Sequence, residues 1–600
     1  MLVCLAFAVT VPFFNYARTI PSADWWTHAL TLALLGGALF AGLFVAKHDE
    51  SPRALLWLLG WWLLVFLPAF ILRSGNVYQL PLSEAGSVLL VTLGAVQTHG
   101  IQHKLGREVV VTVLATSILV AALLQALIGF TQLMGMTPLG HGYLLVDPSS
   151  PRSNIMGNFG QRNQFAQFLS WGVIAAAYLC MTGRLRAWLA VPAMVVLSVV
   201  MAWSGGRLPL AYAVAMVLVA VVWWRRSGDR KVLLSLLVGA GLIITAQLFG
   251  HYIASWLTGL DINTGLDRIN DAGFGARRRI EWEKAWQIVQ AYPWFGVGFS
   301  GFSYQSVWLE AFAGLGKVPE NALFTHSHNL VTQLLGETGI PATLLAAIGV
   351  AACLLPYWRR DQATPENAFL ILIAAALLGH SMFEYPLWYL PFLAMFFVVL
   401  SLSPQKGVSI PVRPALRRVG TLLLLVGTVF YLVSGAKAFT FLQISVFPGG
   451  NAQTNQKNID GLVALSPNLF WSYEAELGLS NYLQPSHHDL EFKRRHYEQL
   501  VAYRPYPLLL CHLAMLRSWS GDQAGARDAM LMALATFPKD GPQLLWRLRA
   551  ANDPSLQPLI DLAQRSVAAR EQGGDLVAVE AITKDLPVRG PQIPDLSRFR

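Results

Sequence analysis

The chain has 600 residues, of which 54% are hydrophobic and 13% are charged, and its mean hydropathy is +0.46. Soluble domains carry roughly 25% charged residues, so this chain lacks the charge to cover a water-facing surface and is suited to a lipid-facing one. A net charge of +10 would suggest nucleic acid in a soluble protein. Here about half of the Lys and Arg residues lie in short loops between apolar runs, where they set membrane topology. We therefore expect a protein surrounded by membrane lipids that binds no nucleic acid.

Apolar runs long enough to cross a bilayer, roughly 20 helical residues each, recur from the start of the chain to about residue 436. The pattern predicts an all-α, polytopic membrane protein with about 12–13 transmembrane helices. The first run has no basic region before it and no small-residue cleavage site after it, so we expect a retained span. The runs lie near 2–17, 27–46, 54–72, 84–98, 108–133, 164–181, 187–203, 208–224, 232–250, 329–355, 366–383, 386–402 and 419–436.

Lys and Arg gather in alternate loops, which predicts a cytoplasmic N-terminus by the positive-inside rule. The loop with Arg225, Arg226, Arg230 and Lys231 is a clear inner loop. The outer turns carry single arginines, which this rule does not explain. They are Arg18, Arg73, Arg152, Arg162 and Arg207.

Two regions are expected to lie outside the membrane. One is an outer loop over 251–328, within a transmembrane domain of residues 1–436. The other is a polar domain of residues 437–600, which follows an odd number of spans. It contains helix-length segments with small residues at packing positions, of which 521–529 resembles a tetratricopeptide-like hairpin. We expect its end, from about Glu571, to be loosely ordered.

The outer loop contains a predicted helix with a tryptophan-bearing face. Arg278, Trp282 and Trp286 are spaced i, i+4 and i+8 and so share this face. Tryptophan at a membrane boundary is an interfacial anchor, which would hold Arg278 at the depth of lipid headgroups. Arg279 lies one turn before Glu283 and can form an ion pair with it. A helix whose arginines only touch headgroups fits the same pattern.

Two histidines, His326 and His328, close the outer loop just before a predicted span, and Asn329 follows them. An imidazole titrates near neutral pH, so it can take a proton from a hydroxyl group and return it. Metal binding is a rival use, but the i, i+2 spacing lacks a clear third ligand. A third interpretation is a polar cluster at a helix start, capped by Asn329.

Three other clusters lie at the expected outer edge. A polar turn over 157–164 contains Gln161 and Asn163, a tight hairpin over 204–207 ends in Arg207, and Glu384 and Tyr385 interrupt two apolar runs. A charged side chain at bilayer depth costs about 2.5–3.5 kcal/mol. Arg207 and Glu384 are therefore expected either to pair with each other or to be functional.

Taken together, these clusters suit one kind of chemistry. Arginine forks match phosphate oxygens and can stabilise a departing diphosphate without a metal. A histidine can deprotonate an attacking hydroxyl group. The combination predicts group transfer from a lipid diphosphate at the outer leaflet, with no cofactor and no metal.

The order of these motifs resembles the O-antigen ligase superfamily and, more closely, its PglL-type protein glycosylation ligases, the bacterial O-linked oligosaccharyltransferases. The resemblance covers nearly the whole chain, including a C-terminal periplasmic helical domain. The motifs that carry it are 160–164, 204–207, the segment from Arg278 and Arg279 through Trp282 to 296–298, 326–329 and 384–386.

The resemblance implies transfer of a preassembled glycan from undecaprenyl diphosphate to a Ser or Thr hydroxyl of a pilin or another periplasmic protein, at the bacterial inner membrane, with inversion at the sugar. By motif match, His328 would be the base, with His326, Tyr385 and Gln161 as further catalytic groups. The diphosphate would be held by cations and an amide, and other residues would support them. The first set is Arg207, Arg278, Arg279 and Asn163, and the second is Glu384, Asn329 and Trp282. Arg277 precedes Arg278 directly, which leaves the register of the phosphate-binding arginine open.

Three other functions fit parts of the pattern. A lipopolysaccharide O-antigen ligase and an O-antigen polymerase would use the same donor with a different acceptor, and the long C-terminal domain favours a protein acceptor. A transporter of lipid-linked sugars should place its charges near the bilayer midplane, whereas this chain gathers them at one edge.

Overall fold

The computed structural model describes residues 1–45, 50–51, 57, 60–65, 82–262, 264–265, 275–409, 413–594 and 596. Contacts divide the chain into two compact units. Unit 1 comprises Met1–Leu59, Gly86–Phe274 and Ala346–Ser434, and unit 2 comprises Gly60–Ala85, Gly275–Leu345 and Gly435–Arg600. The expected division at residue 436, between membrane and extracytoplasmic parts, stays a prediction.

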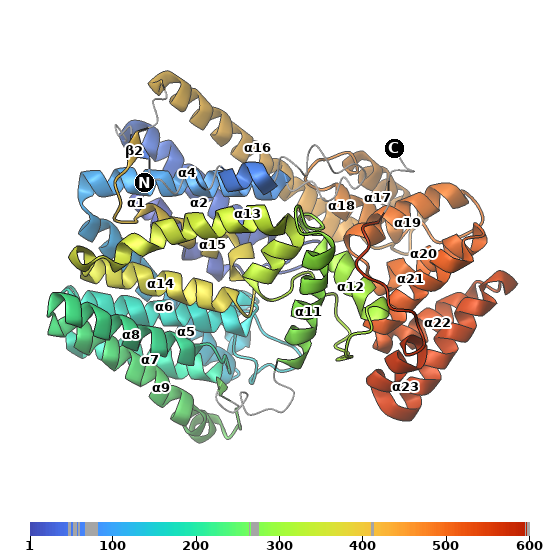
Figure 1. Cartoon of the computed structure of the whole chain (residues 1–600), viewed down its shortest axis with the longest axis horizontal. Helices are drawn as coiled ribbons and strands as arrows, with labels where there is room; N and C mark the ends of the chain where they lie inside the picture. The colour runs from blue at the N-terminus through green and yellow to red at the C-terminus, as the bar shows by residue number, and fades with distance from the viewer. Residues whose placement is uncertain are drawn as a thin grey trace. The chain divides into compact units, whose positions relative to one another are not determined.

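Unit 1 is built around α6 (Arg162–Met181). In the most apolar stretch of this helix, 94% of the residues are buried. Apolar and small residues lie on every face of α6 itself, which is typical of a helix in the core of a bundle. It packs against α5, α7, α9 and α14 (Figure 1). The helices of this unit are α1 (Leu2–Ala8), α2 (Trp25–Val45), α5 (Arg107–Leu133), α6 (Arg162–Met181), α7 (Ala187–Trp203), α8 (Pro209–Ser227), α9 (Arg230–Thr258), α14 (Pro365–Ser381) and α15 (Leu390–Ser401), with most of α4 (Leu82–Leu105) and α16 (Pro414–Ser445).

The prediction of an all-α, multi-pass membrane protein is confirmed. Within the described residues, seven helices are long and apolar enough to cross a membrane: Trp25–Phe44, Arg107–Leu133, Arg162–Met181, Pro209–Ser227, Arg230–Thr258, Leu330–Trp358 and Ala415–Ser445. Three shorter apolar helices, Ala187–Trp203, Pro365–Ser381 and Leu390–Ser401, lie where we expected further spans. The strands β1 (Glu50–Ser51) and β2 (Val408–Ser409) form one short antiparallel pair.

Two of the expected spans differ from the prediction. The run near 2–17 is not one helix, because α1 ends at Ala8 and a 3-10 turn with Pro12 follows it. The run near 84–98 lies in α4, a long helix whose last turns carry His99, His103 and Lys104 and so are less apolar. The expected span near 54–72 lies mostly outside the described residues.

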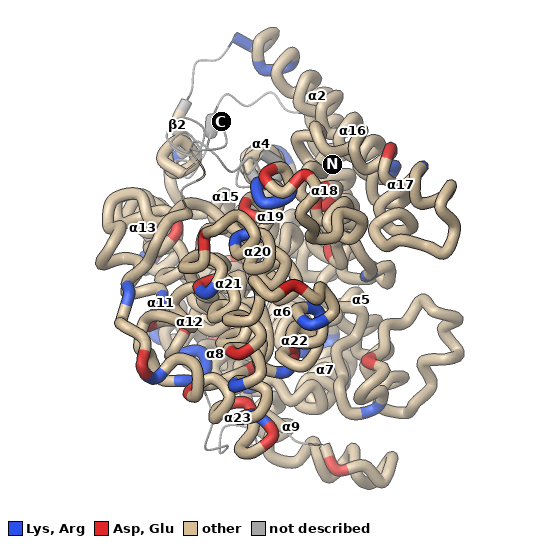
Figure 2. The backbone as a smooth tube through the Cα atoms, turned by 90° about the vertical axis from the view of Figure 1, so that its right-hand side faces the viewer, with Lys and Arg blue, Asp and Glu red and all other residues tan. Residues whose placement is uncertain are grey.

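Unit 2 combines the helices of the predicted outer loop with those of the C-terminal domain. One hydrophobic core joins α12 to α19–α23. Acidic and basic residues are interspersed along α19–α23 (Figure 2), as expected of helices in contact with water. The helices are α11 (Ala276–Ala291), α12 (Phe302–Phe312), the first part of α13 (Leu330–Leu354), α17 (Ala452–Leu465), α18 (Ser472–Ser480), α19 (Leu490–Tyr503), α20 (Pro507–Trp519), α21 (Gln523–Thr536), α22 (Gly541–Ala550) and α23 (Gln557–Thr583).

The chain end that we expected to be loosely ordered is held in place over its described part. Helix α23 continues to Thr583, and the segment 589–592 then runs along α12. The Arg589 guanidinium donates two hydrogen bonds of 2.8 Å to Asp528 and lies 3.6 Å from the ring centroid of Phe312. Trp308 Nε1 donates to the Gly590 carbonyl at 2.9 Å. The order of this segment could not be predicted from the sequence, because the residues that it contacts lie on helices far away in the chain.

Candidate functional site

In unit 1 the candidate site is centred on the start of α6. Gly160, at φ 70°, reverses the chain, and Gln161 then adopts an extended conformation as the N-cap. The Gln161 side chain accepts a hydrogen bond of 2.9 Å from the Gln164 backbone N–H. It thereby satisfies one of the amide groups that a helix leaves unpaired at its first turn. The predicted polar turn is therefore a helix cap in this structure.

Asn163 and Glu384 meet across unit 1. Asn163 Nδ2 donates to Glu384 Oε1 at 3.0 Å, and the Glu384 side chain is buried. A buried carboxylate needs donors to offset its lost hydration, and the first turn of α6 supplies this one. Tyr385 follows in the chain, and its ring stacks on Tyr389 with centroids 6.2 Å apart. The two motifs that we singled out separately thus belong to one cluster.

The hairpin that ends in Arg207 packs against the same turn of α6. A Cβ atom on Gly206 would lie 3.0 Å from the Ala166 side chain and 3.7 Å from Asn163 Oδ1. A Cβ atom on Gly265 would lie only 2.0 Å from the Gly206 carbonyl oxygen. Only glycines permit this close stacking of backbones. The partly exposed Arg207 therefore follows directly after a residue that faces Asn163.

In unit 2 the arginine triplet begins α11, and the structure separates its members. Arg277 is buried and contacts two carboxylates, Glu281 at 2.6 Å and Glu310 on α12 at 3.1 Å. Lys284 contacts the same carboxylates at 2.8 and 2.5 Å. Burial raises the pKa of Glu310, but Lys284 and Arg277 outweigh this effect and hold the value at about 2. Arg277 is therefore part of a buried ion cluster that joins α11 to α12.

The other two arginines lie away from that cluster. Arg278 is half-buried, as is Trp282 one turn later, and Arg279 is exposed. The buried face of α11 is the stripe that contains Arg277, with Glu281, Lys284 and Ile288. The predicted face with Arg278, Trp282 and Trp286 lies next to this stripe, at the edge of the packed region.

A glycine turn after α11 fixes this helix to the first half of α13. Gly298 N–H donates to the Glu337 carbonyl at 2.8 Å, and Ile340 N–H donates to the Pro293 carbonyl at 2.8 Å. Gly296, at φ 60°, permits the approach, because a Cβ atom there would lie 2.4 Å from the Gly336 carbonyl oxygen. The turn thus positions α11 relative to the helix that begins after the histidines.

The histidine motif has a fixed backbone. Ser327 is fully buried, and its N–H donates to Gln333 Oε1 at 2.7 Å. Asn329 Oδ1 accepts from the Val331 and Thr332 amides at 2.9 and 3.1 Å, so the expected cap of α13 is present. His328 lies at φ 57°, a left-handed conformation that is uncommon for residues other than glycine but that histidine, like asparagine and aspartate, adopts more often than most.

The ring contacts of His328 define its hydrogen-bonding state. His328 Nδ1 lies 3.1 Å from the His326 carbonyl oxygen. A carbonyl can only accept, so Nδ1 carries the hydrogen and, in the neutral ring, Nε2 carries the basic lone pair. Phe324 contacts this ring, with centroids 5.5 Å apart, and also lies 4.4 Å from the Arg277 guanidinium. The buried ion cluster is thus connected to His328 through one aromatic ring.

His326 is kept neutral. Burial, the positive charge of Arg504 and His328 together hold the pKa of His326 well below its usual value. Its Nδ1 lies 2.8 Å from Thr325 Oγ1. An imidazole that resists protonation can orient neighbouring groups by hydrogen bonding but carries no charge toward an anionic ligand.

The expected site residues therefore form two groups. Unit 1 gathers Gln161, Asn163, Arg207, Glu384 and Tyr385, and unit 2 gathers Arg278, Arg279, Trp282, His326, His328 and Asn329. The meeting of these two groups at one ligand stays a prediction.

Two models of known protein families match parts of the chain that contain these motifs. A model described as O-antigen ligase matches residues 172–347, which include Arg207 and the histidine motif. A model described as protein glycosylation ligase matches residues 155–180, which include the turn before α6 and nearly all of that helix. Residues 172–347 are thus similar to the O-antigen ligase family. The resemblance drawn from the sequence motifs is therefore confirmed.

Two further similarities flank or span residues 172–347. Residues 368–548 match the C-terminal part of a family described as a virulence factor membrane-bound polymerase. The chain is also 24% identical over 389 residues to a "General O-oligosaccharyltransferase" of Acinetobacter baylyi, a match that covers 62% of this chain and 64% of that relative. The chain thus spans about two thirds of the length of that relative.

Sequence reasoning gave little weight to Arg18 and Arg504, two arginines that lie near candidate site residues. Arg18 forms an ion pair with Asp24, and its side chain lies against Gly160, within 3.1 Å of where a Cβ atom would be. Its position in an outer turn was the only signal. Arg504 follows α19, lies over the ring of Tyr503 at 4.6 Å, and has a buried Nη1 with no hydrogen-bond partner among the described residues. Many arginines occur in residues 437–600, so the sequence did not distinguish Arg504 from them.

Proposed function

We propose that this protein is an O-linked oligosaccharyltransferase of the bacterial inner membrane. It moves a preassembled glycan from undecaprenyl diphosphate to a Ser or Thr hydroxyl of a pilin or another periplasmic protein, and its candidate site faces the periplasm. The observation that carries the proposal is the fixed His328 imidazole, placed with its basic nitrogen defined, in a chain whose residues 172–347 are similar to the O-antigen ligase family. The match to a general O-oligosaccharyltransferase supports the same activity.

His328 is the base in this mechanism. Its Nδ1–H is committed to the His326 carbonyl, so Nε2 takes the proton of the acceptor hydroxyl. The hydroxyl oxygen attacks C1 of the first sugar from the face opposite the diphosphate. The new C1–O bond forms as the bond from C1 to the diphosphate oxygen breaks, and the electron pair leaves with that oxygen. The sugar inverts, and the proton remains on the imidazole until it passes to solvent or to the leaving group.

Cations stabilise the leaving diphosphate. Arg207 in unit 1 and Arg278 and Arg279 in unit 2 bind its oxygens, with Asn163 as an additional donor. Arg277 takes no direct part, because its charge is used by Glu281 and Glu310. Arg504 adds a guanidinium whose Nη1 has no hydrogen-bond partner among the described residues and whose charge acts on His326. No metal is needed, since guanidinium forks supply the positive charge.

The direct test uses the purified protein in liposomes with an undecaprenyl-diphosphate-linked oligosaccharide and a pilin acceptor. His328→Ala should lower the rate of glycan transfer by about 10²- to 10⁴-fold, the usual contribution of a general base. His488→Ala is the matched control, because His488 is an exposed histidine whose side chain is 87% accessible. Full activity of His328→Ala, at normal protein levels, would reject the base assignment. EDTA should leave the wild-type rate unchanged.

A second candidate function is polymerisation or ligation of a glycan on a lipid acceptor. The match of residues 368–548 to a membrane-bound polymerase favours it. Intact-mass analysis of exported proteins, from cells with and without the gene, separates the two. A glycan-sized mass that disappears from a pilin or another exported protein supports the protein ligase. Changed lipopolysaccharide banding with unaltered protein masses supports the lipid acceptor.

A further inference from the structure

A hollow of about 560 Å³ lies in unit 1 at the opposite end of α6 from the candidate site. Cys180, near the last residue of α6, contributes to it, whereas Gln161 caps the first. At 1.5 Å per residue, the helix separates the two ends by roughly 30 Å, about the thickness of the hydrocarbon core of a bilayer. The hollow therefore belongs to the other edge of the membrane-spanning bundle.

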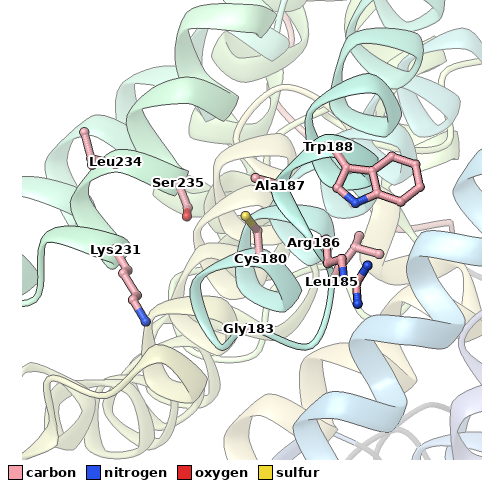
Figure 3. Close-up of a pocket in the computed structure, with 9 residues that line it drawn as sticks. All are labelled: Cys180, Gly183, Leu185, Arg186, Ala187, Trp188, Lys231, Leu234 and Ser235. Carbon is pink, nitrogen blue, oxygen red and sulfur yellow. The ribbon is translucent and has the colours of Figure 1, made fainter.

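The walls of the hollow are apolar and its rim is basic. Figure 3 shows Lys231 of α9 on one side and Arg186, the residue before α7, on the other, with Cys180 and Ser235 between them. Both basic residues are exposed. The neighbouring Arg184 is already paired with Glu108 at 2.5 Å, so it is not the residue that completes the rim.

Large apolar side chains extend the hollow toward the lipid. Trp188 and Leu234 line it and are 66% and 61% exposed. Each lies in the first or second turn of a membrane-spanning or apolar helix, α7 or α9. An indole at a membrane boundary prefers the headgroup region, and a leucine at this depth contacts acyl chains. The surface thus offers a cationic rim above a groove of hydrocarbon character.

We infer that this hollow binds an anionic phospholipid of the surrounding bilayer. The anionic headgroup lies at the rim, where Arg186 and Lys231 on its two sides supply positive charge, and the acyl chains lie along the apolar walls that include Trp188 and Leu234. A basic hollow between transmembrane helices suits an anionic headgroup by charge, and the positive-inside pattern of the loops places it where such lipids face the cytoplasm. This site is separate from the proposed transfer reaction and does not depend on it.

The test measures retention of phosphatidylglycerol by the purified full chain, using native mass spectrometry and titration in phosphatidylcholine nanodiscs. Arg186→Gln combined with Lys231→Gln should weaken the binding of phosphatidylglycerol about 25-fold, since each basic residue near an anionic lipid contributes roughly fivefold. Arg225→Gln combined with Arg230→Gln is the matched control. It removes the same charge from exposed residues near the same bundle edge that do not line the hollow.

A second variant tests the hollow without changing charge. Ser235→Phe fills it from α9, and the bound lipid should be lost although both basic residues remain. The inference is overturned if the control pair weakens binding as much as the rim pair, because the lipid would then respond only to net charge. It is also overturned if the rim pair loses undecaprenyl phosphate and keeps phosphatidylglycerol, because the hollow would then serve a polyprenyl lipid.

Discussion

The two groups of candidate site residues are held by different kinds of interaction. In unit 1, a neutral amide serves a buried carboxylate, and glycines let the backbones touch: Asn163 donates to Glu384, and Gly206 lies against α6. In unit 2, four charged residues of α11 and α12 are buried together between these helices, and the histidine motif is connected to them through Phe324. One half depends on close packing and the other on balanced charge.

Because of this difference, a substitution in unit 1 and one in unit 2 should lower the unfolding free energy by different amounts. A hydrogen bond to a charged group contributes about 1.5–3 kcal/mol, whereas removing one partner of a buried ion pair leaves an uncompensated charge and costs about 3–5 kcal/mol. Unit 2 should therefore lose more stability than unit 1 from a single polar substitution, although the arginines that we propose as ligands of the diphosphate, Arg278 and Arg279, lie outside the buried cluster. Variants that change either the stability of the fold or the binding of the donor, but not both, test this comparison.

The largest expected effect is that of Arg277→Gln. The substitution removes a buried cation from Glu281 and Glu310, so we expect the protein to lose about 3–5 kcal/mol of unfolding free energy. Thermal unfolding in detergent measures the effect. Arg279→Gln, two residues further along the same helix and exposed, should leave the unfolding midpoint within one degree or so of the wild type. Equal losses in both variants would show that the cluster does not set the stability of this half.

Asn163→Ala should have the next largest effect. Glu384 would stay buried and lose its amide donor, at a cost of about 1.5–3 kcal/mol. Asn154→Ala removes a similar amide–carboxylate hydrogen bond, with Asp147 at 2.8 Å, from a surface loop, where the carboxylate can turn to water. This control should therefore cost under about 0.5 kcal/mol. If both variants lower the unfolding free energy by equally small amounts, the Asn163 hydrogen bond is not needed to keep Glu384 buried.

The sequence was sufficient for the framework of the molecule. Apolar runs located most of the helices, because hydropathy is a local signal, and the order of the short motifs located the region that matches the O-antigen ligase model. It also identified Asn329 as a cap, since capping depends on residues within one turn. The segment 521–529, which we compared to a tetratricopeptide-like hairpin, contains the start of α21, which packs against α20; the tetratricopeptide-like nature of the C-terminal domain stays a prediction.

The roles of individual charges could not be predicted from the sequence. Arg277 and Arg279 each precede a glutamate by four residues, so the linear pattern does not show which of them is buried. Glu310, the second carboxylate that contacts Arg277, lies on another helix. The same limit applies to Arg504 and to the C-terminal segment bound along α12, whose contacts join regions far apart in the chain. Such long-range pairings leave no periodic signal.

A third test uses pH and the neutral state of His326. Its pKa is held well below 6.5 in the folded protein, so below pH 6.5 the unfolded chain binds a proton that the folded chain does not. The unfolding free energy should therefore fall as the pH falls, by at most about 1.4 kcal/mol for each pH unit below 6.5, or about 2 kcal/mol at pH 5. His326→Asn cannot be protonated and should lose this part of the pH dependence. His488→Asn, at an exposed histidine, should retain it.

The smallest effect concerns binding and not stability. Arg278→Lys keeps the charge on the half-buried edge of α11 but loses the planar fork that bonds two phosphate oxygens at once. We expect the KM for the lipid-linked donor to rise by about tenfold, which corresponds to one lost bidentate contact of roughly 1.4 kcal/mol, while the unfolding midpoint stays constant. Arg527→Lys, at an exposed arginine of α21, should change neither. If Arg278→Lys leaves the KM unaltered and Arg279→Lys raises it, the ligand-binding position is the exposed one, and α11 presents its arginines from the face away from Trp282. If neither variant changes the KM, α11 contributes to unit 2 through its buried cluster alone, and the diphosphate must be held by other cations.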